Sequence, residues 1–154
     1  LQRHNGKLWY HAALFNGESR SYWPNGTLRI TAGYTNGLLN GRSLSFYNNG
    51  NKESSRFYTM GEKDSVHTGW WENGNLKYEY HFSRGNYNGM FTQWYENGRK
   101  MQQVMYANGE ELYGQGWRES GKLYMNFRMC NGRRYGMNNS NLCYPLNNEV
   151  TKEK

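Results

Sequence analysis

One short pattern recurs along the chain about every 24 residues: an aromatic pair followed closely by Asn-Gly. The glycines that end the copies at 26, 50, 74 and 98 are spaced by 24, Gly121 follows after 23, and Gly6 precedes Gly26 by 20. A fixed period of this length is typical of a repeat protein, in which each repeat packs on its neighbours. We therefore predict a short first repeat, four near-regular repeats and a divergent last one, with the repeats starting near residues 6, 26, 50, 74, 98 and 121.

Glycine placement predicts that these repeats are built from β-hairpins. Eleven of the 19 glycines follow an asparagine, and Asn-Gly supplies positive φ at both central positions of a type I′ turn. A second turn within the repeat is marked by Gly-x-x-x-Gly at 37–41, 85–89 and 132–136. Turns thus recur every 10 to 13 residues, which is the spacing of short antiparallel strands. Frequent Asn-Gly disfavours a helical repeat, since glycine and asparagine are poor helix formers.

Residues between the turns alternate between apolar and polar types. The stretches 28–34, 76–82 and 123–129 place apolar or aromatic residues at every second position, which is typical of a strand with one buried face. The stretches 52–58 and 100–106 carry polar residues at several of the equivalent positions. We interpret this break as alternate hairpins that lie on different sides of a rolled or twisted sheet.

We expect the aromatic pairs both to pack within the array and to present side chains on its surface. They are Tyr22-Trp23, Phe46-Tyr47, Trp70-Trp71 and Trp94-Tyr95. Because neighbours in a strand point to opposite faces, one member should stack on its counterparts while the other faces outward. Each cross-strand aromatic contact adds up to about 1 kcal/mol. The candidate partner-binding stripe consists of Tyr47, Trp71, Tyr95 and Arg118, which share one position in successive repeats; alternatively, these residues merely cover the sheet.

The unit Y-x-N-G-x-x-x-G-x-x-x-x-[FW]-[YW]-x-N-G resembles the MORN repeat, in the variant found in bacterial YwqK-type antitoxin proteins. Residues 34–50 and 82–98 carry it most fully. Residues 58–74 keep the frame but have Ser65 at the second glycine. Residues 106–121 are one residue short and have Arg118 in place of the second aromatic. The resemblance covers about residues 5 to 136.

The resemblance implies an all-β fold, an elongated array of antiparallel β-hairpins that forms a twisted meander sheet. We expect one domain over 1–146, with a cap at 137–146 that Pro145 ends, followed by a polar tail at 147–154. Relatives of this kind are regarded as interaction modules without enzyme activity. The partner would be another protein, either a toxin or a subunit of a bacterial cell-envelope assembly. The chain would then be exported or lipid-anchored, in the periplasm or cell envelope.

Charge allows a second kind of partner. The net charge is +7 and the isoelectric point about 9.4, a balance that suits acidic proteins, nucleic acid or anionic membrane. Lysines and arginines are scattered rather than gathered in a block, which makes nucleic acid an unlikely partner. The alternative function is therefore a scaffold that binds anionic lipid at a membrane surface. The sequence has no apolar run long enough for a membrane-spanning helix.

Residues with catalytic or metal-binding chemistry are few and dispersed. The histidines, at positions 4, 11, 67 and 81, lack the close spacing of a helical zinc site. The acids Glu72 and Glu96 occupy the same turn position, and only Glu110-Glu111 lie adjacent outside it, so no pair of facing carboxylates is expected. We expect no enzyme activity, no metal and no cofactor.

The two cysteines, Cys130 and Cys143, leave their redox state open. They are too few for a disulfide scaffold, and either one bridge or two reduced thiols fits the sequence. Cys130 lies just before the Asn131-Gly132 turn without a recognisable base and orienting group. We therefore interpret Cys130 as a small packing residue rather than a nucleophile.

Overall fold

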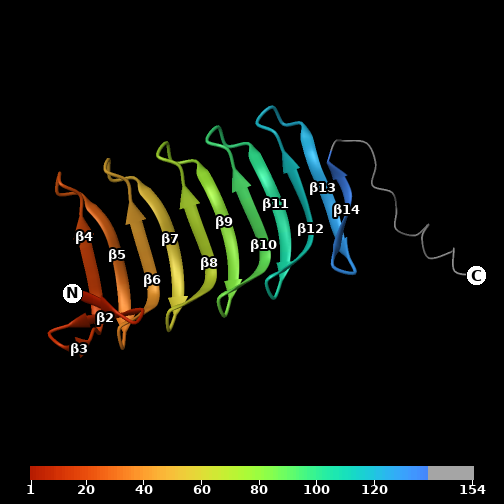
Figure 1. Ribbon diagram of the computed structural model, residues 1–154. Coiled ribbons are helices and arrows are strands. Elements are labelled where there is room, and N and C mark those ends of the chain that lie inside the picture. The colour runs from red at the N-terminus through yellow and green to blue at the C-terminus, as the bar shows by residue number, and fades with distance from the viewer. Residues whose placement is uncertain (139–154) are drawn as a thin grey trace, which may run out of the picture.

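The computed structural model describes residues 1–138, which form fourteen β-strands and no helix (Figure 1). A small sheet contains β1 (Gln2–His4), β2 (Lys7–Tyr10) and β3 (Ala13–Leu14). The first half of the large sheet contains β4 (Gly17–Tyr22), β5 (Leu28–Thr35), β6 (Leu38–Phe46), β7 (Lys52–Thr59) and β8 (Glu62–Trp70). Its second half contains β9 (Leu76–Ser83), β10 (Asn86–Trp94), β11 (Lys100–Ala107), β12 (Glu110–Trp117), β13 (Leu123–Cys130) and β14 (Arg133–Asn138).

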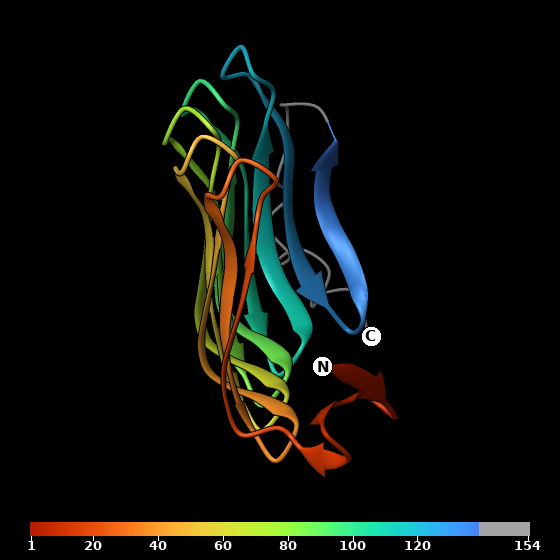
Figure 2. The same cartoon turned by 90° about the vertical axis from the view of Figure 1, so that its left-hand side faces the viewer.

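The large sheet is an open meander of eleven strands, in which neighbours along the chain are also neighbours in the sheet. The predicted all-β array of antiparallel hairpins is thus confirmed. Seen from its end, the sheet is a single bent layer (Figure 2). The idea that alternate hairpins lie on different sides of a rolled sheet is wrong, because β7 and β11 lie in register between their neighbours in the same layer. The predicted cap from residue 139 onward, the tail 147–154 and Cys143 lie outside the described residues.

The small sheet lies across the lower ends of the first strands of the large one (Figure 1). The Leu8 amide donates to the Gly37 carbonyl over 2.8 Å, and the Phe15 ring lies 5.8 Å from the Tyr34 ring. A side chain at Gly37 would bring its Cβ to 2.7 Å from the Leu8 carbonyl oxygen. Glycine at this position therefore allows the two sheets to approach closely.

Turns at the two ends of the strands differ although both contain Asn-Gly. At the lower end the residue before glycine has φ between 48° and 50°, at Asn36, Met60, Arg84, Asn108 and Asn131. These are the predicted type I′ turns. At the upper end only the glycine has positive φ, at 26, 50, 74, 98 and 121. The type I′ prediction is wrong there, because the asparagine instead caps a wider turn, as when Asn25 Oδ1 accepts from the Thr27 amide over 3.0 Å.

One face of the large sheet carries most of the buried apolar side chains, and we call it the aromatic face. Register places Val104 opposite Gly114 and Gly114 opposite Phe127. The buried apolar residues of the large sheet are Ala32, Phe82, Val104 and Phe127, which are 3 to 6 % exposed. Within residues 1–138 no large side chain is completely buried. The core is therefore a layer of rings that pack on one another and on the sheet.

Two glycines in strands make room for this layer. Gly69 lies directly opposite Tyr78, and a Cβ at Gly69 would lie 2.2 Å from the Tyr78 ring. A Cβ at Gly114 would lie 2.7 Å from the ring of its partner Phe127. The rings therefore lie flat over the glycines, where they cover backbone that would otherwise face water. The motif Gly114-Gln115-Gly116 is part of strand β12.

Candidate functional site

The candidate stripe predicted from sequence lies along the upper edge of the sheet. Tyr47, Trp71, Tyr95 and Arg118 each follow the last residue of a strand, namely β6, β8, β10 and β12. The three aromatic residues are half-buried and Arg118 is exposed. The structure thus brings the four residues to equivalent positions in one line, and their role in binding a partner stays a prediction.

The aromatic residues of the stripe, together with Trp23 at the equivalent position of the preceding repeat, also connect successive repeats. Each uses its polar atom to donate a hydrogen bond to a backbone carbonyl about 23 residues further on. The bonds run from Trp23 Nε1 to the Phe46 carbonyl (2.9 Å), Tyr47 Oη to Trp70 (2.8 Å), Trp71 Nε1 to Trp94 (3.1 Å) and Tyr95 Oη to Trp117 (3.0 Å). Because these donors are used inside the array, they contribute to its stability whether or not the rings bind a partner.

Charged groups at the upper edge are held by local contacts. The Lys77 ammonium lies 4.3 Å from the Trp71 ring centre, and the Arg29 guanidinium lies 4.6 Å from that of Trp23, distances typical of cation–π interactions. The Glu72 carboxylate accepts from Asn49 Nδ2 over 3.1 Å. Both Glu72 and Glu96 are exposed turn residues, in the turn position predicted for them.

A second candidate site lies in the middle of the aromatic face and was not predicted from the sequence. It is a groove of about 220 Å³, which we call the tyrosine groove. Its walls come from the neighbouring strands β7, β8, β9 and β10. Its lining residues are Arg56, Tyr58, Lys63, His67, Tyr78, Tyr80, Phe82 and Tyr87. None of these residues is acidic.

Arg56 explains why the groove forms at this repeat. It lies six residues after the repeat glycine Gly50, at the position where other repeats have Ala32, Tyr80, Val104 and Phe127. A long, polar side chain thus replaces a packed apolar one on the aromatic face. The break in apolar–polar alternation at 52–58 was the sequence signal for this site. It marks a polar patch on the same face of the sheet, and not a hairpin on the other side of the sheet.

Stacked rings form the floor of the tyrosine groove. Tyr78 and Tyr80 are 4.4 Å apart at an interplanar angle of 18°, and Tyr80 and Phe91 are 4.0 Å apart at 7°. Phe82 stacks on Tyr87 with centroids 4.7 Å apart. Such pairs contribute roughly 0.5–1.5 kcal/mol beyond the area they bury. The floor is therefore a stable aromatic surface built across β9 and β10.

Two cations at the rim of the groove have no ion-pair partner within residues 1–138. The ion pairs there are Arg20–Glu18, His81–Glu79 and Arg134–Glu111. Instead, Arg56 donates to the Tyr78 hydroxyl over 3.2 Å. The Lys63 ammonium lies 5.1 Å from the centre of the Phe82 ring. The side chains of Arg56 and Lys63 are both exposed, so an anion could reach them from solvent.

His67 lies beneath these cations and is 3 % exposed. Its Nε2 lies 2.7 Å from the Phe57 carbonyl oxygen, and since a carbonyl only accepts, Nε2–H is the donor. Burial lowers the pKa of His67, and the nearby positive charges of Arg56 and Lys63 lower it further. The imidazole is therefore neutral at pH 7 and leaves the positive charge of the groove to Arg56 and Lys63.

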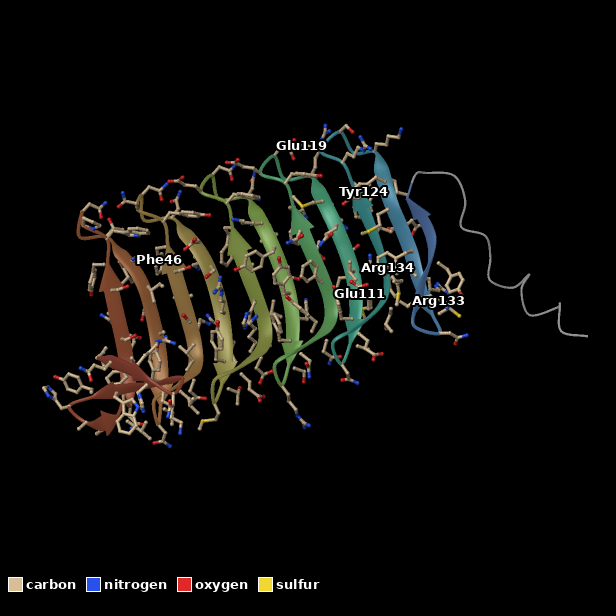
Figure 3. All side chains as sticks on the ribbon, viewed as in Figure 1. Phe46, Glu111, Glu119, Tyr124, Arg133 and Arg134 are labelled. Atoms are coloured by element: carbon tan, nitrogen blue, oxygen red, sulfur yellow. The ribbon has the colours of Figure 1, made fainter. Side chains whose placement is uncertain are left out.

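A further polar cluster, around Glu111, joins three strands of the large sheet. Figure 3 shows Arg134 of β14 beside Glu111 of β12, and Arg134 Nε donates to Glu111 Oε2 over 2.9 Å. Tyr106 donates to Glu111 Oε1 over 3.1 Å. Burial, together with the Glu111 charge, raises the pKa of Tyr106 to about 12. Glu111, predicted only as half of an adjacent acid pair, thus connects β11, β12 and β14.

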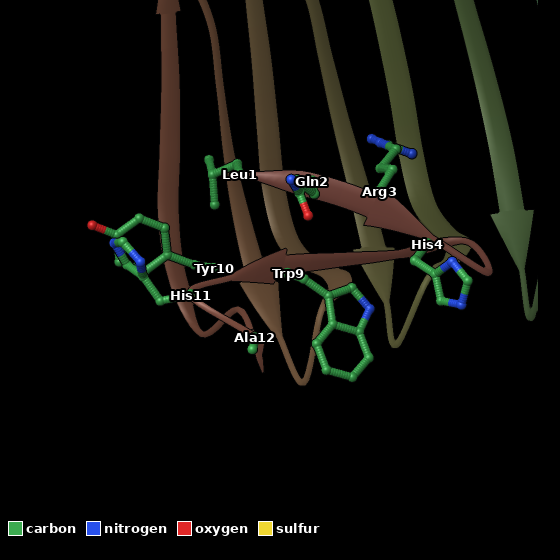
Figure 4. A pocket seen from close by; sticks show the side chains of 8 residues that line it. All are labelled: Leu1, Gln2, Arg3, His4, Trp9, Tyr10, His11 and Ala12. Carbon is green, nitrogen blue, oxygen red and sulfur yellow. The ribbon is translucent and has the colours of Figure 1, made fainter.

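Other candidate residues are dispersed. Cys130 is a free thiol, half-buried at the end of β13. A further cavity is lined only by residues 1–4 and 9–12 of the small sheet (Figure 4). In the part of the chain that the structure describes, no three His, Cys, Asp or Glu side chains gather as metal ligands would. Nor does any helix there have the length and apolarity needed to cross a membrane.

Comparison with protein families identifies the repeat. The MORN repeat variant matches residues 15–36, 63–84 and 87–108. Each matched segment holds one upper turn and all or nearly all of the two strands that flank it. A comparison with curated proteins found no match. MORN repeats in general are modules that bind proteins or membranes, and the MORN repeat variant matches this chain at three places along its sheet.

Proposed function

We propose that this chain is a non-enzymatic module that binds another protein across its aromatic face. The observation that carries the proposal is the open state of that face within residues 1–138. A sheet ordinarily buries its apolar face against a second layer, whereas among residues 1–138 only the small sheet lies over one end (Figures 1 and 2). Aromatic residues and arginine, which are enriched at binding hot spots, are displayed there.

The biological role we propose is that of an antitoxin or immunity-like protein, or of an accessory subunit in a bacterial cell-envelope assembly. The resemblance of residues 34–50 and 82–98 to the YwqK-type unit supports the first role. An elongated repeat surface supports either role, because it can contact a partner over several repeats at once. Both roles require a stable protein partner.

Affinity purification from the native cells, followed by mass spectrometry, tests this proposal. One stoichiometric partner that the chain inhibits would support the antitoxin role, and a set of envelope proteins would support the accessory role. Trp71→Ala and Tyr95→Ala test the upper edge, and Tyr80→Ala tests the aromatic face. Loss of binding only with Tyr80→Ala, in variants that keep the wild-type circular dichroism, would assign the interface to the face. Absence of any protein partner would overturn the proposal.

Anionic lipid is the second candidate partner, and the net charge of +7 favours it. Sedimentation with vesicles of phosphatidylcholine and phosphatidylserine tests this alternative. If the chain binds membranes through charge, binding should weaken steeply as salt is added, since screening shortens the range of electrostatic attraction. Failure to bind at low salt would dispose of the lipid alternative.

A further inference from the structure

We infer that the tyrosine groove receives an acidic side chain, Asp or Glu, from the protein partner of this chain. This inference rests on the proposed protein-binding function and adds the chemistry of the contact. The eight lining residues include two exposed cations, Arg56 and Lys63, and no acid. A carboxylate placed between them would meet two positive charges that have no ion-pair partner within residues 1–138.

The dimensions of the groove fit a side chain better than a larger ligand. Pockets for small-molecule ligands span roughly 300–1,000 Å³, and the groove holds about 220 Å³. Its floor is aromatic and includes the stacked rings of Tyr78 and Tyr80. The methylene groups of a glutamate could rest on these rings while its carboxylate reaches the cations at the rim.

Hydrogen bonds within the groove orient Arg56 so that it can donate to a carboxylate. Arg56 already donates one N–H to the Tyr78 hydroxyl, which orients the guanidinium, and its remaining N–H groups can donate to a carboxylate. His67 is buried and donates its Nε2–H to the Phe57 carbonyl, so it adds no competing charge. A carboxylate bound here would be partly shielded by the rings, and shielded ion pairs are stronger than fully exposed ones.

The same features favour a protein over a membrane surface as the source of the anion. Recognition of anionic lipid usually relies on clusters of roughly four to eight basic residues, and the groove offers two. An acidic protein segment needs apolar contacts beside its carboxylate, and the aromatic floor supplies them. Tyrosines are suited to such contacts because they combine an apolar ring with a polar tip.

Three synthetic peptides of equal length provide the test. They share the same apolar and aromatic residues and carry Glu, Gln or Lys at the remaining positions. Isothermal titration calorimetry measures their binding to the wild-type chain, and NMR follows the Arg56 Nε–H and the ring signals of Tyr78 and Tyr80. We expect only the Glu peptide to bind, with signal changes concentrated in the groove. Equal binding of the Gln peptide, or no binding of the Glu peptide at millimolar concentration, would overturn the inference.

Two double variants separate the groove from bulk charge. Arg56→Gln with Lys63→Gln removes both groove cations, and we expect affinity for the Glu peptide to fall by about tenfold, as for loss of a charge-assisted hydrogen bond. Arg29→Gln with Lys77→Gln removes the same charge from cations that lie over Trp23 and Trp71 instead. This control should bind nearly as well as wild type. Equal losses in both double variants would contradict a specific site.

The source of the anion and the proposed function are tested separately. Inorganic phosphate and phosphatidylserine vesicles, added in competition, should not displace the Glu peptide at matched charge; displacement would overturn the assignment to a protein side chain. If a partner purified from native cells binds the Arg56→Gln, Lys63→Gln variant as tightly as wild type, the groove inference fails while the protein-binding function stands. If no protein partner exists, the proposed function fails.

Discussion

The Tyr47 hydroxyl donates a 2.8 Å hydrogen bond to the backbone carbonyl of Trp70, and this bond joins one repeat to the next above the β-ladder. The equivalent bond runs from Tyr95 to the Trp117 carbonyl over 3.0 Å. Both tyrosines are half-buried. A single-layer sheet has few tertiary contacts between its repeats. Each hydrogen bond between repeats should therefore contribute measurably to the free energy of unfolding.

Replacement of Tyr47 by phenylalanine should lower the free energy of unfolding by about 1 kcal/mol, because the Trp70 carbonyl loses its donor while the ring stays. Urea unfolding followed by circular dichroism measures the change. Tyr113→Phe is the matched control, since Tyr113 is 44 % exposed, and it should change stability little. Equal effects of the two substitutions would show that the Tyr47 bond contributes nothing specific.

The lower turns predict a stabilising substitution. Met60 has φ of 49°, a conformation that asparagine tolerates better than methionine. The equivalent positions in three other lower turns are asparagines, at 36, 108 and 131. Met60→Asn should therefore raise the free energy of unfolding by about 0.5–1 kcal/mol. Thermal unfolding would show a higher midpoint, and Met60→Ala, which keeps a strained residue there, should not.

Gly69 predicts a steric effect on the tyrosine groove. A Cβ at this position would lie 2.2 Å from the Tyr78 ring, so Gly69→Ala must displace the ring and should destabilise the chain by about 1–3 kcal/mol. Tyr78→Ala removes the obstacle. In the double variant the two effects should therefore be much less than additive. Additive losses, measured by urea unfolding, would mean that the ring does not lie over Gly69.

Much of this architecture could be predicted from the sequence because the same pattern of turns and strands recurs in successive repeats. Turn spacing and alternation predicted the strands. Ser65, at the second glycine position of its repeat, has φ of 57°, a conformation that the sequence analysis did not predict. The type I′ prediction failed at the upper turns because Asn-Gly also fits a turn in which only the glycine has positive φ. Dipeptide identity alone does not distinguish the two geometries.

The tyrosine groove could not be predicted because it depends on register. Its residues come from four strands, and pairings such as Tyr58–Lys63, His67–Tyr80 and Phe82–Tyr87 bring them to one face. The signal in the sequence was the polar stretch that contains Arg56. The sequence does not show that β7 lies in the same layer as its neighbours. That stretch therefore suggested a hairpin on the other side of the sheet, and not part of a charged groove.

His67 makes the stability of the chain depend on pH. Burial lowers its pKa in the folded state below the ordinary value of 6.5, so the unfolded chain takes up a proton at a higher pH than the folded chain does. Stability is therefore fully present above the unfolded pKa and is lost as pH falls through 6.5 toward the lowered folded value. The loss between the two pKa values approaches about 1.4 kcal/mol per pH unit.

Urea unfolding at pH 7.5, 6.5 and 5.5, values chosen at about one-unit steps around the ordinary histidine pKa, measures this dependence. His67→Phe should abolish most of it, because phenylalanine cannot titrate and already occupies the equivalent position as Phe91 in the next repeat. His81→Gln, a control on a half-exposed histidine beside Glu79, should keep it. If His67→Phe retained the wild-type slope, the acid sensitivity would arise from other titrating groups, and the contribution assigned to His67 would be wrong.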